Sequence, residues 1–132
     1  MKIHTLTRTV VSAGVVLVSV AAAALSGAAP AAAATRYGCE WPRVCFYKTE
    51  ADWQARRPTA TYQDMGYWQT LGSHSAYSEV VYNSRNDDGA LLRMQSGITY
   101  CVKGGQTTPE FFMPVYQDGA MEELKIMDSK TC

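Results

Sequence analysis

The side chains with the most specific chemistry in this sequence are its four cysteines, Cys39, Cys45, Cys101 and Cys132. An even number of cysteines in a small chain indicates either disulfides or a metal site. A zinc site is disfavoured, because Cys39 and Cys45 are not spaced as a C-x₂₋₄-C pair and the sequence contains no H-x₃₋₅-H. Two disulfides allow three pairings. We predict Cys39–Cys45, which are close in sequence, and Cys101–Cys132, which would tie down a chain end.

Side chains suited to catalysis are sparse after residue 34. His74 is the one histidine there, and neither a G-x-S-x-G elbow nor an H-E-x-x-H motif is present. A glycosidase needs two acids that face one cleft. The adjacent acids Asp87-Asp88 and Glu122-Glu123 are more typical of solvated surface charge. The sequence therefore predicts a protein that is not an enzyme and that has no catalytic residues, no cofactor and no metal.

Two further patterns are compatible with binding. Aromatic rings can stack on sugars, and the candidates for such a surface are Trp41, Trp53, Tyr62, Tyr67, Trp68 and Tyr77. Calcium prefers six to eight oxygen ligands, and the candidates for these are Asn83, Asn86, Asp87 and Asp88. Core packing of the aromatics and a solvated acidic turn are the simpler interpretations in a small domain. A non-catalytic extracellular binding or structural module, for carbohydrate or calcium, remains the alternative function.

Residues 1–34 have the three parts of a secretory signal peptide. A short basic region precedes an almost wholly apolar stretch over residues 10–25, and an A-x-A cleavage site follows that ends at Ala34. The alternative is an uncleaved membrane anchor, but the apolar stretch is short for a spanning helix of about 20 residues. We predict that residues 35–132 form one exported, extracellular domain without membrane contact after cleavage.

The charge balance of that domain bears on its partners. The whole chain has 12 basic and 12 acidic residues and a net charge of zero. Since Lys2 and Arg8 lie in the predicted signal peptide, acids outnumber bases in residues 35–132. This balance argues against a nucleic-acid or anionic-membrane partner, both of which require a basic face. A domain of this length buries a limited core and often needs covalent stabilisation, which two disulfides would provide.

Short β-rich runs separated by turns organise residues 35–132. Gly and Pro punctuation favours an all-β sandwich or barrel-like domain. The tail, residues 120–127, has helical spacing of Met121 and Leu124 but also alternates into Leu124 and Ile126, and we favour a strand. Ser96-Gly97 indicates a turn that joins the last two of the runs as a hairpin. The predicted runs are residues 44–47, 59–62, 77–82, 90–94 and 98–102.

The segment Cys39–Tyr47 (CEWPRVCFY), followed by Trp53 and Arg56-Arg57, resembles the opening of the Streptomyces-type metalloproteinase inhibitor family. Ser78–Ser84 (SEVVYNS) is similar to a later segment of that family. The resemblance extends over most of residues 37–132. It implies a small βγ-crystallin-like Greek-key sandwich with two disulfides.

The resemblance also implies inhibition of a secreted peptidase. Inhibition in the family is attributed to the bond between a disulfide cysteine and a following aliphatic residue, and Cys101-Val102 is the corresponding position. A bulky apolar residue after the scissile bond suits a thermolysin-like zinc metallopeptidase. The Cys101–Cys132 disulfide would hold the segment Thr99–Lys103 rigid, so that little entropy is lost on binding. The expected protein is a secreted, monomeric inhibitor; the alternative for Cys101-Val102 is a disulfide in a β-hairpin without protease contact.

Overall fold

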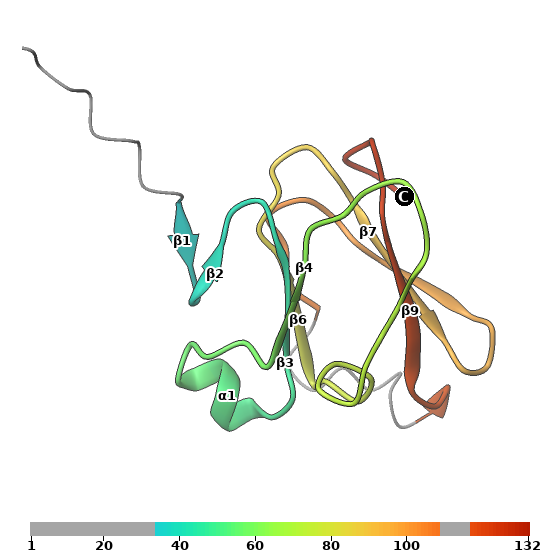
Figure 1. Cartoon of the computed structure of the whole chain (residues 1–132), viewed down its shortest axis with the longest axis horizontal. Helices are drawn as coiled ribbons and strands as arrows, with labels where there is room; N and C mark the ends of the chain where they lie inside the picture. The colour runs from blue at the N-terminus through green and yellow to red at the C-terminus, as the bar shows by residue number, and fades with distance from the viewer. Residues whose placement is uncertain (1–33, 109–116) are drawn as a thin grey trace, which may run out of the picture. The chain divides into compact units, whose positions relative to one another are not determined.

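The computed structural model describes residues 34–108 and 117–132, so the predicted signal peptide lies outside the described residues except for Ala34. The described chain is all-β apart from one short helix, α1 (Glu50–Gln54) (Figure 1). Its strands are β1 (Thr35–Arg36), β2 (Cys39–Glu40), β3 (Val44–Tyr47), β4 (Ala60–Tyr62), β5 (Gln69–Thr70), β6 (Val80–Asn83), β7 (Ala90–Met94), β8 (Thr99–Val102) and β9 (Met121–Ile126).

A three-stranded antiparallel sheet has the strand order β4-β3-β6. All four residues of its central strand β3 are buried. Since successive side chains point to opposite sides of a strand, β3 is buried on both faces. Val44 and Phe46 enter the larger core, whereas Cys45 and Tyr47 enter a smaller aromatic cluster. The N-terminal hairpin β1–β2 contributes Cys39 to that smaller cluster, and the Cys39–Cys45 disulfide joins it to β3.

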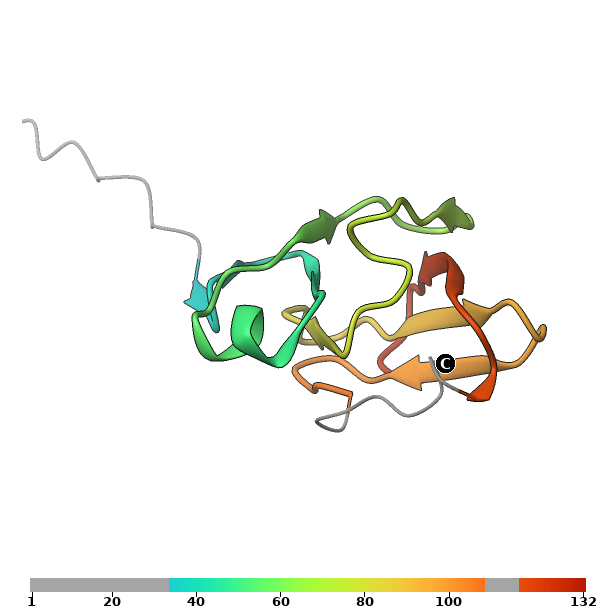
Figure 2. The same cartoon turned by 90° about the horizontal axis from the view of Figure 1, so that it is seen from below.

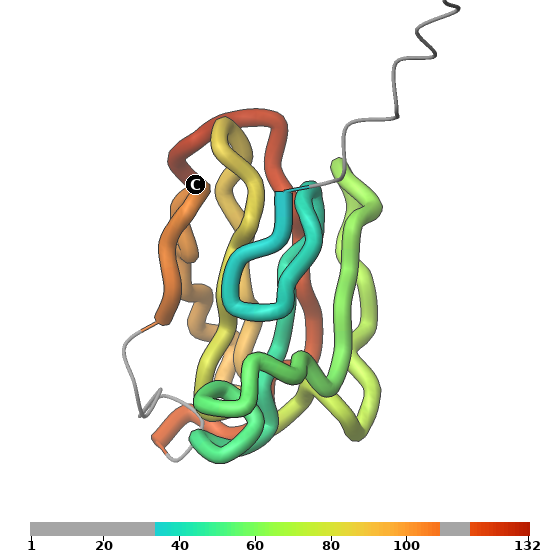
Figure 3. Tube along the Cα trace, turned by 90° about the vertical axis from the view of Figure 1, so that its left-hand side faces the viewer, coloured from blue at the N-terminus to red at the C-terminus, as the bar shows by residue number. Residues whose placement is uncertain are grey.

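A four-stranded antiparallel sheet has the order β5-β9-β7-β8. Leu92, Leu124 and Ile126 from this sheet pack with Val44 and Phe46 of the other sheet in the larger core. The strands of both sheets lie roughly along one common axis in the tube view (Figure 3). Two sheets with one shared core are compatible with a small β sandwich.

The predicted strands are present with small shifts of their ends, and the antiparallel register Leu91↔Cys101 confirms the hairpin of β7 and β8 (Figure 2). The third predicted run, residues 77–82, begins as a strand only at Val80, because Ser78 closes a turn on Ser75. The helix α1, the hairpin β1–β2 and the two-residue β5 were not predicted.

The tail is the predicted strand, and it lies inside the sheet between β5 and β7. Its helix-like spacing has a structural cause. The pairing of β9 with β7 shifts between Arg93 and Met94, so that Arg93 opposes Glu123 while Met94 opposes Met121. This bulge inserts one residue. Met121 and Leu124 can therefore both face the core although they are three positions apart.

Candidate functional site

The candidate segment Thr99–Lys103 lies along β8, the outer strand of the four-stranded sheet. Within residues 34–108 and 117–132, no strand pairs with the edge of β8 that faces away from β7. Thr99, Cys101 and Lys103 are exposed. The exposed Cys101 forms a disulfide with Cys132, the pairing expected from the sequence. One extended strand at a sheet edge is thus covalently fixed through its outward-facing residue.

Val102 lies on the opposite face of β8 from Cys101. Its side chain is only 3% exposed and belongs to the larger core, opposite Ala90 of β7. The structure therefore brings Cys101 to the surface but buries its neighbour. In this conformation Val102 cannot place its side chain in the pocket of a protease. Its side chain instead anchors β8 to the larger core.

Asn83 fixes the C-terminal end of β8 through its side chain. It is fully buried, and its side-chain amide donates to the carbonyl oxygens of Asp88 at 2.7 Å and Val102 at 3.1 Å. Its own side-chain oxygen accepts the backbone N–H of Arg85 at 3.1 Å. Asn83 therefore ties β6, the following turn and β8 together. Sequence reasoning assigned Asn83 to a possible calcium site and missed this role.

Asp88, another candidate calcium ligand, takes part in the same contacts. The Asp88 carboxylate pairs with the Arg85 guanidinium at 2.6 Å, and both side chains are mostly buried. Asn86 and Asp87 lie between these two residues in the chain and are exposed. Across residues 34–108 and 117–132, no three His, Cys, Asp or Glu side chains are grouped closely enough to hold a metal ion. Asn83, Arg85 and Asp88 thus form a structural network. Within this network the side-chain amide nitrogen of Asn83 acts as a hydrogen-bond donor, which a calcium ligand would not do.

The residues considered for catalysis are not brought together. His74 is exposed in a loop where its backbone carbonyl accepts the Thr59 hydroxyl at 2.8 Å. The nearby Ser75 hydroxyl is buried and bonds with the Tyr62 hydroxyl at 2.9 Å. Glu122 and Glu123 flank the bulge of β9, and because Met121 and Leu124 both face the core, the two glutamates lie on the opposite side and line one shallow hollow. The Glu123 carboxylate is engaged by the Arg93 guanidinium, which fits a structural ion pair better than a glycosidase acid.

The six candidate aromatics do not form one surface. Trp53 packs on Tyr37 and Tyr47, with ring centres 4.6 and 4.9 Å apart. Trp68 lies under the guanidinium of Arg93 at 4.2 Å, and Tyr62 packs against the larger core. The three that remain exposed are Trp41, Tyr67 and Tyr77.

Burial of Tyr47 in the smaller aromatic cluster, with a smaller contribution from Tyr82, raises its pKa well above the usual value for tyrosine. Burial likewise raises the pKa of Tyr82, although Arg36 partly opposes this shift. A tyrosine in the unfolded chain loses its proton near its ordinary pKa of about 10. The folded protein holds the proton to a higher pH. The stability linked to these groups is therefore constant below about pH 10 and is lost as the pH rises towards the folded-state pKa.

We predict that Tyr47→Phe lowers the free energy of unfolding by about 1 kcal/mol at neutral pH, because the Tyr47 hydroxyl donates to the carbonyl of Tyr37 at 2.8 Å. Above about pH 10 the variant should lose less additional stability than the unmodified protein, since one buried hydroxyl no longer needs to ionise. Urea unfolding across the alkaline range measures both effects. Parallel decline of the two proteins would show that Tyr47 is not the group responsible.

No helix among the described residues is long and apolar enough to cross a membrane. The two disulfides are typical of an oxidising, extracellular environment. Comparisons with protein-family models, with curated proteins and with solved structures found no match to this chain.

Proposed function

We propose that residues 35–132 are an exported inhibitor of extracellular metallopeptidases that acts by binding and performs no catalysis. The observation that carries the proposal is the disulfide-fixed outer strand β8, with Cys101 facing outward. Peptide recognition commonly proceeds by adding an extended strand to an exposed sheet edge. A segment that is already extended and fixed loses little entropy when it enters a cleft.

The resemblance of Cys39–Tyr47 and Ser78–Ser84 to the Streptomyces-type metalloproteinase inhibitors supports the same function. It also leads us to infer a βγ-crystallin-like Greek-key arrangement of the two sheets. Export through residues 1–34 and a monomeric state belong to this proposal. A thermolysin-like zinc metallopeptidase is the proposed target.

Burial of Val102 changes how the segment would act. The backbone of β8 and the exposed side chains of Thr99, Cys101 and Lys103 would contact the enzyme, while Val102 stays in the core. Cleavage of the Cys101–Val102 bond requires the segment to deform around the catalytic centre. The disulfide on one side of that bond and the buried side chain on the other oppose this deformation, so the segment would bind without being cleaved rapidly.

Titration of a thermolysin-like metallopeptidase with the exported, oxidised protein tests the function. We expect a stoichiometric loss of peptidase activity. In Thr99→Arg a long charged side chain crowds the proposed contact strand, and inhibition should weaken at least about tenfold. Thr70→Arg is the matched control, because Thr70 is also an exposed threonine on a short outer strand, β5.

Inhibition by the unmodified protein and by Thr70→Arg, with loss in Thr99→Arg, supports both function and segment. Equal inhibition by all three proteins keeps the function and rules out β8 as the contact. A folded, oxidised protein that inhibits no thermolysin-like enzyme contradicts the proposed target and function together.

A further inference from the structure

A second surface feature lies at the edge of the other sheet, away from the candidate segment on β8. It is a hollow of about 350 Å³ at the end of the outer strand β4. This volume lies within the range of about 300–1,000 Å³ that is usual for small-ligand pockets. Every lining residue has a polar side chain; they are Arg43, Thr61, Tyr62, Gln63, Asp64 and Gln69.

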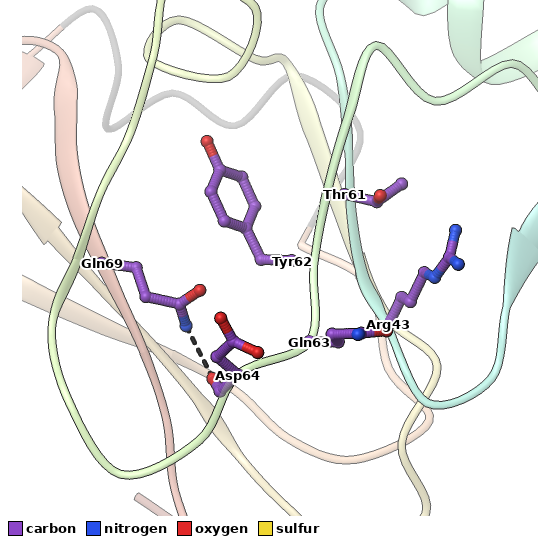
Figure 4. A pocket seen from close by; sticks show the side chains of 6 residues that line it. All are labelled: Arg43, Thr61, Tyr62, Gln63, Asp64 and Gln69. Carbon is purple, nitrogen blue, oxygen red and sulfur yellow. Dashed lines mark hydrogen bonds between the residues drawn. The ribbon is translucent and has the colours of Figure 1, made fainter.

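The strand register explains how these side chains meet. Val44 of β3 opposes Tyr62 of β4, and side chains alternate along each strand. Figure 4 shows Thr61 and Arg43 on one side of the β4 chain, with Asp64 and Gln69 on the other. The hollow therefore extends across a strand edge and has polar groups on both sides.

The groups in the hollow provide both donors and acceptors. The Gln69 side-chain amide donates to the backbone carbonyl of Asp64 at 2.6 Å, which orients its carbonyl oxygen as an acceptor. The Asp64 carboxylate accepts the Tyr67 hydroxyl at 3.0 Å and has capacity for further bonds. The Arg43 guanidinium contacts Glu40 at 3.5 Å in an exposed pair, which is a weak interaction.

The charges on the lining side chains balance, with one guanidinium and one carboxylate. A strongly anionic or cationic ligand would therefore be repelled by a charge of its own sign on one side of the hollow. A neutral ligand with many hydroxyl groups matches the alternation of donors and acceptors, because each hydroxyl both donates and accepts.

An exposed aromatic ring accompanies the hollow. Tyr67 is 55% exposed, and its hydroxyl is held by Asp64 of the lining. An exposed ring held beside a polar hollow offers a flat apolar surface next to hydrogen-bonding groups. The apolar face and hydroxyl rim of a sugar ring require that combination.

We propose that the hollow formed by Arg43, Asp64 and Gln69, with Tyr67 as its stacking platform, binds a neutral saccharide. The site is independent of protease inhibition, since it lies on β4 and the loop to β5, whereas the candidate segment lies on β8.

Isothermal titration calorimetry of the exported, oxidised protein with cellohexaose, maltohexaose, mannohexaose and chitohexaose tests the proposal. We expect binding of at least one of them. Tyr67→Ala should weaken that binding about tenfold through loss of stacking, and Tyr67→Phe should retain most of it. Asp64→Ala should weaken it by a similar factor through loss of an acceptor. Tyr77→Ala is the control, because Tyr77 is 53% exposed and does not line the hollow.

Three results would overturn the proposal. One is no binding of any hexasaccharide by the folded protein at millimolar concentration. Another is that Tyr67→Ala and Asp64→Ala bind the saccharide as strongly as the control variant Tyr77→Ala. The third is binding of a sulfated heparin oligosaccharide alone, which would assign the surface to an anion through Arg43. Both Asp64 and Tyr67 are exposed, so their variants should fold, and thermal unfolding of each variant verifies this.

Discussion

Val102→Asp is expected to unfold the domain or to lower its free energy of unfolding by on the order of 4 kcal/mol, the range of a buried unpaired charge. Val102 is 3% exposed and packs in the core shared by the two sheets. The buried residues of that core cluster are apolar, so a carboxylate among them would be desolvated. Urea unfolding followed by circular dichroism measures the effect.

Lys103→Asp is the matched control for that prediction. It introduces the same carboxylate one residue further along, at an exposed position, and should change stability by no more than about 0.5 kcal/mol. Similar stability of the two variants would contradict the burial of Val102. Because Val102→Asp disturbs folding, a loss of inhibition in that variant would not by itself show that Val102 contacts the peptidase.

Removal of the Cys101–Cys132 disulfide by paired replacement with serine is expected to cost about 3–4 kcal/mol, from the chain entropy of a loop with a sequence separation of 31. Loss of β8 anchorage should accompany it, because Cys101 is the outward residue of that strand. Urea unfolding of the oxidised proteins measures the cost. Inhibition should also weaken under conditions in which the variant remains folded.

The Cys39–Cys45 disulfide provides the comparison, since it closes a much shorter loop with a sequence separation of 6. Its paired replacement should cost about 2 kcal/mol by the same relation. A larger loss for this pair than for Cys101–Cys132 would show that packing of the buried Cys39 and Cys45 outweighs loop entropy.

The strands that could be predicted from the sequence are those with β-branched and aromatic runs, such as Val44–Tyr47 and Thr99–Val102. Three elements lacked that signal. The hairpin β1–β2 turns at Tyr37-Gly38, both with positive φ, without the Asn-Gly pair that usually marks such a turn. A side chain at Gly38 would also collide with the Arg56 carbonyl oxygen, a long-range constraint that local sequence does not reveal.

The helix α1 and the strand β5 were missed for a related reason. Five residues are too few for helical periodicity, although Thr49 and Asp52 form a capping box that marks the start of α1. The two residues of β5 are in a strand because they pair with Glu123 and Leu124 of β9. That pairing is a tertiary contact and leaves no local pattern.

The candidate segment was chosen from the sequence, but the environment of its residues was not predicted. Cys101 and Val102 were predicted together as the protease-contacting position. In the structure, alternation along β8 turns Cys101 outward and Val102 into the core, which was not predicted from the sequence. The role of Asn83 could not be predicted, because its hydrogen-bond partners Asp88 and Val102 come together only in the folded sheet. The polar hollow at β4 was missed for the same reason.

Hydrogen–deuterium exchange of the exported protein, alone and in complex with a thermolysin-like zinc metallopeptidase, tests the central claim most directly. The account predicts protection of the backbone amides from Thr99 to Lys103 on binding, with no change in α1 or β5. Protection confined to another surface, or the absence of any complex with a folded and oxidised protein, would contradict it.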